Sequence, residues 1–243
     1  MRSYVEEGVV EKVRAAGGEI FAISSEPQTL SSRAQSEWRL GFESVGDPHH
    51  EIADLCRERG WLDLFFNERL SFLKRSAGEG QDWEPTHPKG YFQPGVLVLS
   101  REGKILYRWR GVPTHSNLGG AAARPTAAHV WSQVEEALRH DTPVGSDAPL
   151  DEDPPLDFKG IPWVAFVPLL IANGWFLTPR GLGSPAHIPR AALRLLGFIA
   201  VWVVALLWLP TLPVLFVLAI WIAYITPKII WVGQEFQKES KST

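Results

Sequence analysis

The feature that most constrains this chain is a long apolar run near its C-terminal end. Residues 195–226 are 32 consecutive positions without a charged side chain. A membrane-spanning helix needs about 20 apolar residues, so the run is too long for one untilted span. The sequence Leu-Pro-Thr-Leu-Pro at 209–213 interrupts it. The run therefore predicts either two helices of about 15 residues joined as a tight hairpin or one tilted, kinked helix.

Basic residues flank the run on both sides. Arg190 and Arg194 precede it and Lys228 follows it. Because Lys and Arg concentrate on the cytoplasmic side of membrane proteins, both ends of a hairpin are expected on that side. A second apolar stretch, 161–178, is interrupted by prolines, an asparagine and a glycine and is expected at the membrane interface. The sequence thus predicts that residues 159–243 form hydrophobic helices whose partner is membrane lipid.

The residues before this region have the composition of an ordinary soluble domain. The segment 143–158 is acidic, rich in proline and without periodicity, which predicts a linker after a domain at 1–142. A formal net charge of −3 gives no reason to expect a nucleic-acid partner. One cysteine, Cys56, excludes a disulfide within the chain and is typical of a reducing compartment.

Residues 1–142 alternate between helical and strand patterns, which predicts an α/β fold. The predicted helices are 1–16, 27–40, 49–59 and one from residue 126 onward, and the predicted strands are 19–23, 42–45, 96–100 and 105–109. The last two strands flank a short turn and form a hairpin at one side of the sheet. The stretch 67–90 is expected to be a partly helical insertion ending in a surface loop. A helix leading straight into a buried strand is half of a βαβ unit, and the strand expected before it is absent.

Three motifs in this order resemble the peroxiredoxin-like proteins of the alkyl hydroperoxide reductase and thiol-specific antioxidant (AhpC/TSA) family. They are GGEIFAISSE at 17–26, SVGDP at 44–48 and QPGVLVLSREGKILYRW at 93–109. The resemblance covers residues 1 to about 140 and implies a thioredoxin-like fold that lacks its first strand here. In such folds the proline before the hairpin is usually cis and forms one wall of the active site, which corresponds to Pro94.

The resemblance also implies where the reactive thiol belongs. In this family the peroxidatic cysteine lies at the N-terminus of the first long helix, where the helix dipole stabilises the thiolate. Relatives often read Cys-x-x-Cys-Arg there, and Arg2 corresponds to that arginine, so the cysteines would precede Met1. Either the chain belongs to a longer protein, or it has lost its first strand and thiol. The first alternative is favoured, because a missing central strand exposes unpaired backbone groups.

Other candidate residues are interpreted as structural. Cys56 shares a predicted helical face with Ile52 and Leu55, away from a helix N-terminus, so it is expected to be a core side chain with a raised pKa. His49 and His50 are adjacent, with no further ligand at metal-binding spacing, and are expected to be solvated. Nothing in the sequence implies a metal or a cofactor.

Taken together, the sequence and the resemblance predict a membrane-tethered, peroxiredoxin-like thiol redox protein that faces the cytoplasm. Its substrate would be a peroxide and its partner a thiol reductant protein, with the chain as written inactive because its peroxidatic cysteine would lie upstream. The alternative is a catalytically silent, thioredoxin-like adaptor or binding module at a membrane.

Overall fold

The computed structural model describes residues 2–67, 89–112, 123–139, 147–157, 162–182 and 185–234. They fall into two compact units. The described residues up to 157 form the first, here called the α/β unit, and those from 162 onward form the second, here called the hairpin unit. Of the expected insertion at 67–90, residues 68–88 lie outside the described part.

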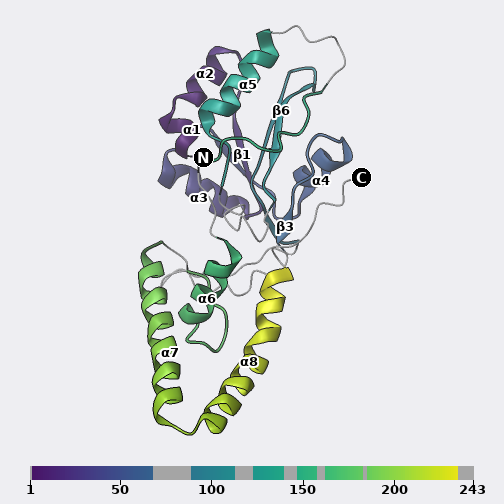
Figure 1. Ribbon diagram of the computed structural model, residues 1–243. Coiled ribbons are helices and arrows are strands. Elements are labelled where there is room, and N and C mark those ends of the chain that lie inside the picture. The colour runs from purple at the N-terminus through teal and green to yellow at the C-terminus, as the bar shows by residue number, and fades with distance from the viewer. Residues whose placement is uncertain are drawn as a thin grey trace. The chain divides into compact units, whose positions relative to one another are not determined.

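The α/β unit confirms the predicted mixed α/β class. Its elements are α1 (Arg2–Glu6), α2 (Val9–Ala15), β1 (Phe21–Ser24), α3 (Gln28–Trp38), β2 (Glu43–Gly46), α4 (Glu51–Glu58), β3 (Phe66–Asn67), β4 (Tyr91–Phe92), β5 (Gly95–Leu99), β6 (Ile105–Arg110) and α5 (Ala127–Arg139). Helices α1, α2 and α5 lie on one side of the strands and α4 on the other (Figure 1). The predicted helices and strands that fall in the described residues are present to within a few positions, except that the helix expected over 1–16 is divided in two.

The prediction of one continuous helix over 1–16 is wrong. Helix α1 ends at Glu6 and α2 begins at Val9, and Gly8 between them has a left-handed φ of 67°. Glycine adopts this conformation without a Cβ penalty, so it allows the chain to change direction there. The change of direction accompanies the burial of Val9 and Val10, and Val10 packs with Ala22 of β1 and with Phe42.

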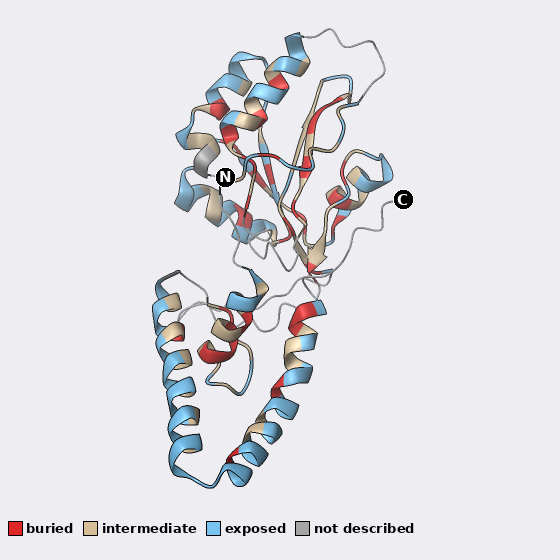
Figure 2. Ribbon diagram, viewed as in Figure 1, coloured by how far each residue is buried: buried red, intermediate tan, exposed pale blue. Residues whose placement is uncertain are grey.

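The described strands form three separate two-stranded sheets. Strands β1 and β2 are parallel, with Phe21 opposite Glu43 and Ser24 opposite Gly46. Strands β5 and β6 form the predicted antiparallel hairpin, and β3 pairs with β4. Hairpin β5–β6 packs against α5 through a buried cluster: Leu106, Tyr107, Trp109, Val130 and Val134. Figure 2 shows this core as the buried stretch along β6.

Residues 147–157, expected to belong to a linker, are instead bonded along the edge of the α/β unit. The backbone of Ala148 donates to Ile105 O, and that of Asp151 donates to Arg108 O at 2.9 Å. Leu150 forms a parallel bridge with Arg108. An acidic, proline-rich sequence lacks the alternation of a strand, so its pairing with β6 is not visible in the sequence pattern.

The hairpin unit consists of α6 (Trp163–Asn173), the short 3-10 helix η3 (Pro185–His187), α7 (Ile188–Trp208) and α8 (Thr211–Gln234). Helices α7 and α8 meet at residues 209–210, so the hairpin alternative is confirmed over the single kinked helix. The two helices have 21 and 24 residues and are longer than the predicted 15. Pro213 lies in the first turn of α8, where proline costs no intrahelical hydrogen bond, so it does not delay the helix.

Helix α6 packs between α7 and α8 near the open end of the hairpin (Figure 1). Val167 and Ile171 of α6 pack against Ile225 of α8, and Leu170 packs against Val232. The interruptions noted in the sequence limit α6 to 11 residues, which is about half of what a membrane span needs.

Candidate functional site

The carboxyl ends of the parallel strands β1 and β2 gather a set of buried polar residues, here called the edge cluster. Its members are Ser25, Asp47, His50, Asn67 and Gln93, and each is less than one-tenth exposed. In open α/β sheets the carboxyl edge is where ligand and catalytic sites are found. The edge cluster is therefore the candidate functional site of the α/β unit.

Asp47 organises one half of the edge cluster. It follows β2 and its backbone N–H donates to Ser24 O at 2.7 Å, which fixes the ends of the two strands to each other. Its carboxylate accepts hydrogen bonds from the backbone N–H groups of Glu51, Ile52 and Ala53 at 2.7, 3.1 and 3.1 Å. The first N–H groups of a helix have no partner within the helix, so Asp47 supplies the missing acceptors for α4.

The prediction that His50 is solvated is wrong, whereas His49 is exposed. His50 precedes α4 in a left-handed conformation, and its ring lies 4.6 Å from the ring of Phe66 and 4.7 Å from that of Phe92. Its Nε2 donates to Gly90 O at 3.0 Å. Phe66 and Phe92 belong to paired strands far along the chain, so a helix pattern around residue 50 gives no sign of this burial. No three His, Cys, Asp or Glu side chains of the described residues come together as a metal site requires.

Pro94 follows the edge cluster directly. Gln93 Nε2 donates to Asn67 Oδ1, and the backbone N–H of Phe92 donates to Ser25 Oγ at 3.4 Å. Pro94 is half-buried and its carbonyl accepts from the Gly111 N–H at 2.6 Å. Its peptide bond is trans, which corrects the cis bond that the family resemblance implies. The resemblance is drawn from sequence motifs, and these do not set the isomer, which depends on packing around the bond.

Cys56 lies within α4 and is only partly buried, and Leu55 on the same predicted face is exposed, so the prediction of a core side chain is wrong. Burial, with a smaller contribution from the nearby Asp47 carboxylate, raises the pKa of the Cys56 thiol. The thiolate is the reactive form, so Cys56 has the environment of an unreactive thiol. Arg2 is the first residue of α1, and its side chain lies outside the described part of the structure.

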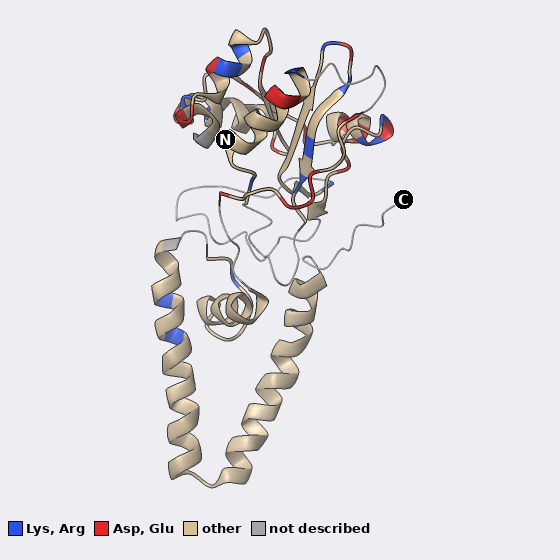
Figure 3. Cartoon of the chain, turned by 45° about the horizontal axis from the view of Figure 1, so that its top comes forward, with Lys and Arg blue, Asp and Glu red and all other residues tan. Residues whose placement is uncertain are grey.

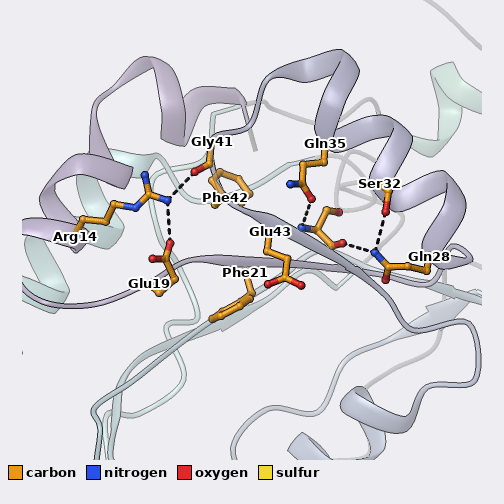
Figure 4. A pocket seen from close by; sticks show the side chains of 10 residues that line it. Arg14, Glu19, Phe21, Gln28, Ser32, Gln35, Gly41, Phe42 and Glu43 are labelled. Atoms are coloured by element: carbon orange, nitrogen blue, oxygen red, sulfur yellow. Dashed lines mark hydrogen bonds and ion pairs between the residues drawn. The ribbon is translucent and has the colours of Figure 1, made fainter.

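An open hollow lies over β1, β2 and α3, and Figure 4 shows the side chains that line it. Several of their polar groups bond to one another or to the neighbouring backbone. Arg14 donates to Glu19 at 3.1 Å and to Gly41 O at 2.7 Å, while Gln28 donates to Ser44 O at 2.9 Å. These bonds connect α2, α3 and the strands, so the hollow is interpreted as a structural feature.

A second set of polar side chains connects residues 147–157 to the core of the α/β unit. Tyr107 OH donates to Asp151 Oδ2 at 2.9 Å, and His129 Nε2 donates to the same oxygen at 2.8 Å. Burial and the adjacent Asp151 carboxylate raise the pKa of Tyr107. Burial also raises the pKa of Tyr4 in α1 to about 12. Both phenols are therefore held in the neutral form when the protein is folded.

This arrangement predicts alkaline destabilisation of the α/β unit. An unfolded tyrosine loses its proton near pH 10, so between pH 10 and about 12 the unfolded state binds fewer protons than the folded one and stability falls as pH rises. We expect Tyr107→Phe to reduce the slope of this fall, measured by urea unfolding at pH values from neutral to about 12. The same slope in Tyr107→Phe and the parent chain would contradict this role.

Comparisons with protein-family models, with curated proteins and with solved structures found no match. Fold and site define a class: a mixed α/β protein with two C-terminal helices, α7 and α8, that are long and apolar enough to cross a membrane. Large apolar side chains along both helices are exposed, and most of their surface is drawn as exposed in Figure 2.

Proposed function

We propose that this protein is held at a membrane by the α7–α8 hairpin and performs peroxiredoxin-like thiol redox chemistry there, with the α/β unit in the cytoplasm. The observation that carries the membrane part is the exposed apolar surface of α7 and α8. Monomeric soluble proteins rarely expose contiguous apolar patches of more than a few hundred Å², and a lipid bilayer is the solvent that such surfaces fit.

The cytoplasmic orientation of the α/β unit is supported by charge. Arg190 lies in the first turn of α7 and Lys228 in the last third of α8, and the turn at 209–210 between the helices is uncharged. With both basic ends on the cytoplasmic side, the α/β unit that precedes them is on that side as well.

A thioredoxin-like fold for the α/β unit is supported by the order of its elements. Helix α2 leads into β1, α3 connects β1 to the parallel β2, and a Pro-led hairpin and a helix follow. These are the features that the AhpC/TSA resemblance requires after its first strand. In that family the thiolate sulfur attacks a peroxide oxygen, the O–O bond breaks, and the products are a sulfenic acid and an alcohol or water.

A second candidate function is a thioredoxin-like binding module at a membrane without catalysis of its own. The observation that favours it is Cys56, the single cysteine of the 243 residues, which lies within a helix and has a raised pKa. The edge cluster, with its buried hydrogen bonds, would then hold the shape of a docking surface.

Peroxide consumption separates the two functions. We expect the 243-residue chain to consume no more hydrogen peroxide than its Cys56→Ser variant, because the Cys56 thiol is not activated. If the thiol redox proposal holds, the protein isolated from its natural source has an intact mass above 27.1 kDa, consumes peroxide, and loses this activity when its thiols are alkylated.

Two outcomes would change the proposal. A natural mass of 27.1 kDa without peroxide consumption leaves the binding module as the function. Consumption by the 243-residue chain that disappears in Cys56→Ser would instead identify Cys56 as the reactive thiol.

A further inference from the structure

The described part of the hairpin unit carries positive charge only. Its charged residues are Arg180, Arg190, Arg194 and Lys228, here called the basic collar, and the described residues from 162 onward contain no Asp or Glu. Figure 3 shows acidic and basic residues mixed over the α/β unit, whereas the only charged residues in α7 are basic. Because the whole chain has a net charge of −3, this positive charge is a local feature of the hairpin unit.

Arg194 and Lys228 of the basic collar lie at similar distances from the closed end of the hairpin at residues 209–210. Arg194 is 14 residues before the end of α7 at Trp208, and Lys228 is 17 residues after the start of α8 at Thr211. At a rise of 1.5 Å per residue these separations correspond to ~21 and ~26 Å from the closed end. The hydrocarbon core of a bilayer is about 30 Å thick. With the closed end at the far edge of this core, the backbones of Arg194 and Lys228 are ~4–9 Å short of the near headgroups, a distance that their long side chains span by snorkelling.

Two members of the collar are fixed by the last residue of α6 and by the loop that follows it. The Arg194 guanidinium donates to the backbone O and the Oδ1 of Asn173, both at 3.3 Å, and lies 4.2 Å from the Trp175 ring centre. Lys228 Nζ donates to Leu177 O at 2.6 Å. The loop thus binds to both spans, and Trp221 Nε1 adds a hydrogen bond to Phe176 O at 2.8 Å.

These partners position the cations without neutralising them. Carbonyl oxygens, an amide and aromatic rings carry no net negative charge, and the structure shows no carboxylate partner for the four collar residues within its described part. Arg180 and Arg190 also donate no side-chain hydrogen bond to a described residue. A cationic group at headgroup depth is stabilised by an anion that approaches from the membrane.

We propose that the basic collar binds the headgroups of anionic phospholipids, and that the protein prefers these lipids to zwitterionic ones. The proposal rests on the membrane anchoring proposed above. A phosphate accepts paired hydrogen bonds from a guanidinium, which suits the three arginines. In a choline lipid the quaternary ammonium cancels the phosphate charge, whereas phosphatidylglycerol or phosphatidylserine keeps one net negative charge to meet the collar.

Tryptophan quenching by brominated lipids tests this preference in the full chain. The protein is reconstituted in phosphatidylcholine vesicles with a minor fraction of phosphatidylglycerol, and bromine is carried either by the glycerol lipid or by an equal fraction of the choline lipid. At equal fractions, we expect the brominated glycerol lipid to quench the tryptophans more strongly. The brominated choline lipid should need about a fivefold higher fraction to quench as strongly. The preference should weaken at high salt.

The variant Arg180→Gln, Arg190→Gln removes the two collar residues that make no side-chain bond within the described structure. We expect it to lose most of the preference, and the matched variant Arg180→Lys, Arg190→Lys to keep it. Equal quenching by both lipids in the parent chain, or an unchanged preference in the Gln variant, would overturn the proposal while leaving the anchor intact. Absence of quenching by either lipid would instead refute the membrane anchoring itself.

Discussion

Replacing Asp47 with alanine is expected to destabilise the α/β unit by about 2–4 kcal/mol. The carboxylate is the acceptor for three backbone N–H groups at the start of α4, and the side chain is only 4% exposed. Loss of a helix cap costs about 0.5–2 kcal/mol. Because water does not reach these donors freely, leaving them unsatisfied adds about 1–3 kcal/mol.

Hydrogen exchange provides the measurement. We expect the amides of Glu51, Ile52 and Ala53 to lose protection in Asp47→Ala, and the urea midpoint to fall. Asp47→Asn keeps one acceptor oxygen and should lose less. Asp54→Ala, which removes a partly exposed carboxylate of the same helix that pairs with Arg57 near the surface, is the control and should change little. Unchanged protection of these three amides in Asp47→Ala would show that the cap does not hold α4.

The edge cluster shows what the sequence could predict and what it could not. Asp47 stands in the SVGDP motif just after the predicted strand 42–45, and Ser24 and Ser25 follow the predicted strand 19–23. A rule that carboxyl ends of parallel strands meet at one edge would have joined them into a site. His50 could not be assigned in this way, because its burial depends on Phe66 and Phe92, which local periodicity does not relate to it.

The hairpin unit also combines features that the sequence predicts with contacts that it does not predict. The uncharged run and its Pro-containing break predicted two helices, since length and composition decide whether a segment can cross a membrane. The contact of Arg194 with Asn173 and Trp175 was not predicted, because it requires α6 to fold back between α7 and α8. Trp175 and Phe176 also adopt left-handed conformations, with φ of 55° and 61°, that non-glycine residues rarely adopt and that no residue pattern announces.

Replacing Val201 with arginine is expected to reduce membrane insertion of the full chain about a hundredfold. Val201 lies near the middle of α7, and its side chain is 67% exposed. In water an arginine at such an exposed position costs almost nothing, whereas at the centre of a membrane-spanning helix it costs about 2.5–3.5 kcal/mol. The same substitution is therefore tolerated by a helix in water and strongly unfavourable for a helix in lipid.

Leu193→Arg is the matched control for this substitution. Leu193 has nearly the same exposure, 69%, but it lies beside Arg194 in the basic collar, where a guanidinium reaches the headgroups. We expect Leu193→Arg to remain resistant to extraction by alkaline carbonate, as the parent chain does, and Val201→Arg to become extractable. Exposure alone cannot explain a difference in extraction between the two variants, because the two side chains are almost equally exposed. A solvent whose polarity changes with depth, such as a bilayer, does explain it. If both variants behave like the parent chain, the apolar faces of α7 and α8 cover a protein partner or each other, and lipid is not their solvent.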